Sequence, residues 1–212
     1  IPALLACSAV HQHLIANGRR MRTGLIVESG EPREVAHVAL LVGFGAGAVN
    51  PYLALETVTR LQRDKRLSRA LDEDVAQKNY VTALKKGLLK TMAKMGISAV
   101  SSYHGAQIFE AIGVDQVVVD RYLGGTPSRI RGVGLQQIAE ESLERHLRTY
   151  TPGLSHELDV GGRHFYRVTG EAHLWNPRSV ASLQKAVRLH DQTAYDDYAR
   201  AINDQSDRAL TL

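Results

Sequence analysis

Two short apolar runs, separated by a turn, a helical stretch and a cluster of glycines, constrain the fold of this chain most strongly. Residues 23–28 (TGLIVE) form an apolar run bounded by polar residues and Gly30, as expected for a buried parallel strand. Apolar residues then recur at helical spacing over residues 35–42, and a second short strand follows at residues 48–49. This order predicts a parallel β-α-β unit.

The glycine cluster at residues 43–47 (GFGAG) has the composition of a nucleotide-binding loop but the wrong position. Loops that cradle phosphates follow a strand and open a helix, whereas this one follows a helix and opens a strand. We therefore interpret it as a tight connection and not as a cofactor site. Asn50 and Pro51 come next, and they predict a helix start with Asn50 as its N-cap.

The same alternation continues along most of the chain and predicts an α/β fold, with parallel strands and helices in an open sheet or a partial β/α-barrel-like arrangement. Further strands are expected at residues 97–100 and 114–119, and an extended or hairpin segment at 160–168. Helices are expected at residues 2–17, 35–42, 52–61, 75–95, 106–112, 135–146, 177–190 and 193–202.

Composition excludes several classes of protein. Its 26 basic and 22 acidic residues are dispersed, without the basic stripe of a nucleic-acid-binding surface. No apolar run approaches the roughly 20 residues that span a bilayer, so no membrane partner is expected. Cys7 is the single cysteine, which excludes an internal disulfide and predicts a reducing compartment such as the cytoplasm. The opening IPALLACSAV lies directly inside a helical pattern and suggests a piece of a longer protein.

Functional side chains in parallel α/β folds gather where strands end. The candidates at these positions are Glu28, Ser29, Asn50, Ser101 and Ser102. They include neither a nucleophile–base pair nor a set of metal ligands, and helix capping is the commoner role of such residues. His11 and His13 lie two apart on one predicted helix, so they cannot share a metal and are interpreted as ordinary helix histidines.

The sequence resembles the large chain of glutamate synthase over most of its length. The matching segments are residues 2–14 (PALLACSAVHQHL), 24–55, 79–112, 128–139 (SRIRGVGLQQIA) and 159–187. Two departures stand out: Ala36 occupies a position where a histidine is expected, and His104 one where the family usually has a longer basic residue. The second departure argues against a salt bridge at that turn.

This resemblance implies a glutamate synthase fragment, in which glutamine, 2-oxoglutarate and a reductant give two glutamates. Residues 1–150 resemble the C-terminal part of the central α/β domain, and residues 151–212 resemble a linker and the start of the FMN-binding domain. The fragment alone is expected to be inactive. Its implied partners are the amidotransferase and FMN domains of the same chain, with a small reductase subunit or ferredoxin as donor. The implied central-domain role is to join these units and help form an ammonia channel.

The implied cofactors of the parent, FMN and an iron–sulfur cluster, are expected outside this fragment, which should bind no cofactor and no metal. The donor, NADPH, NADH or ferredoxin, stays open at this point. An alternative from another class is a self-contained β/α enzyme or phosphate-binding module. It would use Glu28, Asn50, Ser102 and the loop at residues 124–129 (GGTPSR), which lacks the Lys-Ser/Thr ending of a P-loop.

Overall fold

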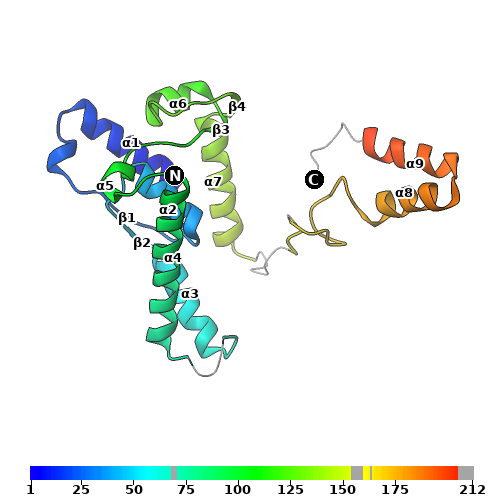
Figure 1. The fold of residues 1–212 in the computed structure, drawn as a ribbon, viewed down its shortest axis with the longest axis horizontal. Helices are drawn as coiled ribbons and strands as arrows, with labels where there is room; N and C mark the ends of the chain where they lie inside the picture. The colour runs from blue at the N-terminus through cyan, green and yellow to red at the C-terminus, as the bar shows by residue number, and fades with distance from the viewer. Residues whose placement is uncertain (68–70, 154–159, 163, 205–212) are drawn as a thin grey trace. The chain divides into compact units, whose positions relative to one another are not determined.

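The computed structural model describes residues 1–67, 71–153, 160–162 and 164–204. The chain divides into two compact units, Ile1–Arg148 and Thr149–Leu212 (Figure 1). The elements of the first unit are α1 (Ala3–Ala16), η1 (Arg20–Arg22), β1 (Ile26–Glu28), α2 (Val35–Gly43), β2 (Ala48–Asn50), α3 (Tyr52–Arg63), α4 (Glu73–Lys94), α5 (Val100–Tyr103), β3 (Ile112–Val114), α6 (Gln116–Tyr122), β4 (Ile130–Val133) and α7 (Leu135–Tyr150), whose last two residues fall in the second unit. The second unit contains α8 (Pro177–Leu189) and α9 (Gln192–Asn203).

The β-α-β unit predicted from the first apolar runs is confirmed. β1 and β2 pair in parallel, and the glycine cluster forms the tight connection between α2 and β2. One face of this sheet carries Val27 and Val49, which pack against Cys7 of α1 and Leu41 of α2. Both helices therefore cover the same face. The sheet is two-stranded and open, so the open alternative is confirmed over a barrel.

A second group of buried residues lies where α2, α4 and α5 meet. Met92 and Tyr103 are almost fully buried against Ala39 and Val42. The Tyr103 hydroxyl donates to the carbonyl oxygen of Ala39 at 3.0 Å, which satisfies its polar end inside the core. In Figure 1, α3 and α4 run side by side as a helical pair.

The predicted N-cap at Asn50 is wrong. Asn50 is the last residue of β2, and its carbonyl oxygen accepts from the N–H of Ser29 at 3.2 Å. Pro51 takes the N-cap position of α3 without a side-chain hydrogen bond. Pairing with β1 therefore holds Asn50 in extended conformation, and its amide bonds across the sheet instead of capping the helix.

The predicted elements between residues 97 and 119 are also wrong. The N–H of Ile97 donates to the carbonyl oxygen of Met92 at 2.9 Å and closes the end of α4, so no strand forms at 97–100. Gln107 has a φ of 51°, and its N–H bonds to Gly43, which prevents a helix at 106–112. Asp115 caps α6 by accepting from the N–H of Val117 at 2.8 Å, so the valine-rich segment is helical and not a strand.

A second two-stranded parallel sheet, β3–β4, was missed by the sequence pattern. Gly113 lies inside β3 with a φ of 74°. The backbone of Gly132 in β4 approaches Gly113 so closely that a Cβ atom on Gly132 would overlap the carbonyl group of Gly113. Glycine at both positions therefore permits this pairing.

In the second unit, α8 and α9 confirm the two predicted helices. Asn176 and Ser179 form a capping box at the start of α8, and Pro177 occupies its first turn. The segment predicted as extended or hairpin folds back on itself, because the N–H of Glu171 donates to the carbonyl oxygen of Gly161 at 3.3 Å. Within its described residues, 160–162 and 164–168, no strand is formed.

Candidate functional site

Three of the five predicted site residues meet where β1 and β2 end. Glu28 and Asn50 are register partners, and the Asn50 amide donates to a Glu28 carboxylate oxygen at 3.0 Å. Ser29 adds its backbone bond to Asn50, and its hydroxyl accepts from the N–H of Glu31 at 3.1 Å. The Glu31 carboxylate in turn accepts from the N–H of Ala3 at 2.7 Å, at the start of α1. The strand ends and α1 are thus joined by one polar network.

Ser101 and Ser102 lie elsewhere, because the strand expected before them does not exist. Both are exposed on α5. His104 follows them, and its imidazole contacts the carbonyl oxygen of Gly45 at 2.9 Å. Gly45 precedes β2, whereas Glu28 and Asn50 mark the other end of the sheet. The structure therefore separates the two serines from the strand-end group.

A groove of about 400 Å³ opens beside the strand ends, between α3 and α4. Some of its polar groups are engaged with protein partners: Gln77 donates to the hydroxyl of Thr59 at 2.7 Å, and Arg63 makes a two-bond contact with Glu73 at 2.8 and 3.0 Å. Asn50 lies at its margin. The groove offers carboxylate, amide and guanidinium groups to a small polar molecule, without a nucleophile–base pair among the residues that line it.

Sequence reasoning missed a cluster of basic side chains around the Gly45 carbonyl. Arg20 donates to the Nδ1 atom of His11 at 2.8 Å and to the carbonyl oxygen of Gly45 at 2.9 Å. One nitrogen of Arg20 also lies 3.4 Å from Nε2 of His104. His11 is 7% exposed, so it is a core residue that ties α1 to two loops. No spacing rule links residues 11, 20 and 104, which only the fold brings together.

These contacts determine the protonation state of His11. Since Nδ1 accepts a hydrogen bond from an arginine, the ring is held neutral. Burial lowers the pKa of His11 below its usual 6.5, and the positive charges of Arg20 and His104 lower it further. At His104, the turn is held by contacts to the backbone carbonyl of Gly45 and to Arg20.

The loop at residues 124–129 is used to hold the fold together, which argues against a phosphate site. Arg129 makes two bonds to the Glu110 carboxylate, at 2.6 and 2.7 Å, and these bonds lower the pKa of Glu110. The carbonyl oxygen of Gly124 accepts from the amide of Gln12 at 3.4 Å. The Arg129 guanidinium, the cationic group of this loop, is therefore engaged with a protein carboxylate.

Cys7 does not have the surroundings of a metal ligand or a nucleophile. It is 6% exposed and its thiol points to the carbonyl oxygen of Phe44 at 3.8 Å. Burial raises the pKa of the thiol, which Arg20 only partly opposes. Among the described residues, no group of three or more histidine, cysteine and acidic side chains could hold a metal, and none of the described helices could cross a membrane. The donor set of this chain does not fit an iron–sulfur cluster, which needs several thiolates.

Comparison with known proteins gives one consistent result. The family model described as glutamate synthase central domain matches residues 1–115. The chain is 45% identical to the large chain of the NADPH glutamate synthase of Bacillus subtilis, covering 97% of this chain and 13% of that relative. It is 43% identical to the NADH glutamate synthase of Schizosaccharomyces pombe, covering 98% and 10%. It is 40% identical to ferredoxin-dependent glutamate synthase 1 of Arabidopsis thaliana, covering 97% and 13%. The chain thus spans about a tenth to an eighth of the length of these relatives.

Proposed function

We propose a function that follows from one fact: this chain belongs to the glutamate synthase family, through its central domain. The chain would serve in a longer enzyme that converts glutamine and 2-oxoglutarate, with a reductant, into two glutamates. Its part would be to join the ammonia-releasing amidotransferase domain to the FMN domain that consumes the ammonia. It would also help wall the passage between them.

The observation that carries this proposal is the match of residues 1–115 to the central domain in a chain that is about an eighth of its relatives' length. The polar contacts within the described residues support a connecting role. The Glu28–Asn50 bond joins two strands, Arg129 holds Glu110, and Arg20 joins α1 to the Gly45 loop. Each contact braces one part of the first unit against another.

We propose that Glu28, Ser29 and Asn50 brace or line the ammonia passage, because they form a connected polar group where the two strands end. An ammonia passage needs a few hydrogen-bonding groups and shelter from bulk water. Ser101 and Ser102 remain candidates on α5, as a separate group. Residues 1–150 would then be the C-terminal part of the central domain, and residues 151–212 the linker and start of the FMN domain.

The choice of electron donor would be made outside this chain. Relatives named for NADPH, NADH and ferredoxin match it at 45%, 43% and 40% identity, so the residues of this segment are compatible with all three. We also place FMN and the iron–sulfur cluster on other parts of the enzyme. The cytoplasm remains our expectation for this protein, on the basis of its single cysteine.

Leakage of ammonia from the intact enzyme tests the channel role. In Glu28→Ala and Asn50→Ala variants, glutamine hydrolysis should continue while glutamate synthesis falls behind it and free ammonia accumulates. Lys86→Ala, on the exposed face of α4, is the matched control and should leave the two reactions coupled. Tight coupling in both strand-end variants, and in Ser101→Ala and Ser102→Ala, would end the channel proposal and leave a purely connecting role.

The alternative, a self-contained enzyme or phosphate binder, is tested by titration with FMN and with inorganic phosphate. The connecting role predicts no saturable binding of either to residues 1–212. Tight FMN binding by this chain alone would contradict the connecting role.

A further inference from the structure

Among the described residues, the strand β1 pairs with a strand on one side only, where β2 lies. Just before β1, the carbonyl oxygen of Leu25 accepts from the N–H groups of Gly47 and Ala48, and just after it the N–H of Ser29 donates to the carbonyl oxygen of Asn50. Since backbone groups alternate sides along a parallel ladder, those of Ile26 and Glu28 point away from β2. They form a free edge in a two-stranded sheet. A free edge of this kind is a template for pairing with another strand.

A groove of about 390 Å³ runs along this free edge, between β1 and α1. Its floor and walls are largely apolar, with Ala6 and Val10 on the helix side and Ile26 on the strand side. Ile26 is 76% exposed and Val10 is 47% exposed. An apolar groove beside unpaired backbone groups suits an extended segment that both pairs with β1 and packs under α1.

The topology indicates which strand belongs in this groove. α1 and α2 cover the same face of the sheet, since Cys7 and Leu41 pack in one cluster with Val27 and Val49. Connections between parallel strands are almost always right-handed. Successive right-handed connections with helices on one face add strands in one direction. A strand that enters α1 would therefore lie on the side of β1 opposite β2, at the free edge.

We propose that a strand from the part of the parent polypeptide that leads into α1 pairs in parallel with β1. This inference rests on the proposed function, in which the chain is one segment of a longer enzyme, and the chain's share of 10–14% of its relatives leaves ample polypeptide to supply the strand. The added strand carries apolar side chains toward Ala6 and Val10, as buried parallel strands do. The sheet then has the order added strand, β1, β2.

Amide hydrogen exchange in the intact parent enzyme tests this pairing. The added strand predicts that Ile26 and Glu28 amides exchange at least about a hundredfold more slowly than unpaired amides. The Ser29 amide, bonded to Asn50, is the internal reference for a paired position. Exchange of Ile26 and Glu28 at the rate of exposed loops would overturn the proposal. Protection that rises with enzyme concentration would also overturn it, because a second copy of the chain would then be the partner.

Two lysine substitutions on α1 separate occupation of the groove from general damage to the helix. Val10 lines the groove and Ile15 does not, yet they are 47% and 50% exposed in this chain. Val10→Lys should speed exchange of the Ile26 and Glu28 amides about tenfold in the intact enzyme, whereas Ile15→Lys should leave them unchanged. Equal effects of the two variants would contradict an occupied groove. If either variant fails to fold, the exchange rates of the Ile26 and Glu28 amides in the unsubstituted enzyme decide whether the added strand is present.

The added strand and the ammonia channel can be rejected independently, because amide exchange tests the first and ammonia leakage tests the second. Free exchange at Ile26 and Glu28 in an enzyme whose strand-end variants leak ammonia would reject the added strand and keep the proposed function. Slow exchange in an enzyme whose variants stay coupled would keep the strand and reject the channel.

Discussion

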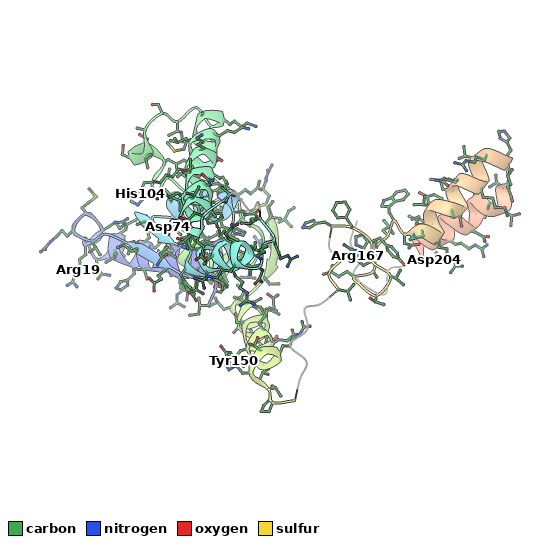
Figure 2. All side chains as sticks on the ribbon, turned by 90° about the horizontal axis from the view of Figure 1, so that it is seen from below. Arg19, Asp74, His104, Tyr150, Arg167 and Asp204 are labelled. Atoms are coloured by element: carbon green, nitrogen blue, oxygen red, sulfur yellow. The ribbon has the colours of Figure 1, made fainter. Side chains whose placement is uncertain are left out.

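Two helices of the first unit, α4 and α7, both carry apolar side chains at helical spacing but have opposite surroundings. α4 buries Ala76, Leu84 and Met92 against neighbouring elements. α7 buries none of its described residues: Leu143 is 56% exposed, Leu147 is 51% exposed, and Tyr150 is 71% exposed. Figure 2 shows α7, in yellow-green, projecting from the other helices of the first unit.

The difference shows what an apolar stripe does and does not determine. In both helices the stripe marks a face that is stabilised by burial, and it correctly predicts helical structure. Whether the face is buried depends on a partner. α2 and α3 supply that partner for α4. The same pattern can therefore belong to a helix that holds the core together or to one that leaves its apolar face open.

The largest effect on stability is expected when a core side chain is removed from α4. Met92 is 2% exposed and packs with Ala39, Val42 and Tyr103. Met92→Ala should lower the free energy of unfolding by about 3 kcal/mol, through lost apolar burial and the cavity that remains. Urea denaturation monitored by circular dichroism measures the change. A loss below about 1 kcal/mol would show that the core around α4 relaxes freely.

A smaller effect is expected where α4 approaches α2. A Cβ atom on Gly87 would overlap the side chain of Val35, so Gly87→Ala should destabilise the chain by roughly 1–2 kcal/mol despite the better helix propensity of alanine. Gly134, just before α7, is the matched control, since only Gln137 lies nearby, at 3.5 Å. Gly134→Ala should be neutral in the same denaturation experiment. If both substitutions destabilised the chain, the start of α7 would be more tightly packed than the structure shows.

Lowering the pH should reduce the stability of the first unit, through His11 where α1 contacts the Gly45 loop. His11 has a lowered pKa in the folded chain, mainly because it is buried. The unfolded chain thus binds the proton more tightly, and the stabilisation that this difference gives is complete above pH about 6.5 and is lost as the pH falls through the folded pKa. Thermal melts at pH 7 and pH 5 should show a smaller pH dependence in His11→Gln. His13→Gln, on an exposed part of α1, should melt as the unsubstituted chain does at both pH values.

The smallest effect is expected on α7 itself. Leu143→Ala should change the free energy of unfolding of residues 1–212 by less than about 0.5 kcal/mol, because the side chain is already half exposed. This variant and Met92→Ala form a pair within the comparison. A loss on α7 as large as that on α4 would show that its apolar face is covered within this chain.

Much of the fold could be predicted because local signals and tertiary contacts agree. Gly18 and Gly96 follow α1 and α4 with φ values of 65° and 75°, the left-handed conformation in which glycine commonly ends a helix. The strands β1 and β2 were predicted as apolar runs around a helix. Their ends, Glu28 and Asn50, were predicted to lie together because parallel strands share an edge.

The rest could not be predicted because long-range contacts override local preference. The valines at 117–119 favour a strand, but the Asp115 side chain caps a helix there. Gln107 takes a positive φ because its N–H finds a partner at Gly43. Ser101 and Ser102 were placed with the strand ends on the strength of a strand that α4 and α5 replace. The basic cluster depends on contacts across 84 residues of sequence, between Arg20 and His104.

Because Cys7 is buried, its reaction with a thiol reagent can report the opening of the first unit. Cys7 is the single thiol, it lies on the buried face of α1, and its raised pKa keeps it in the unreactive thiol form. Because Cys7 is only 6% exposed, a thiol reagent reaches its sulfur mainly after α1 separates from the sheet. At high reagent concentration, the labelling rate therefore equals the rate at which that helix lifts away, which turns a buried packing residue into a kinetic measure of how firmly the first unit is closed.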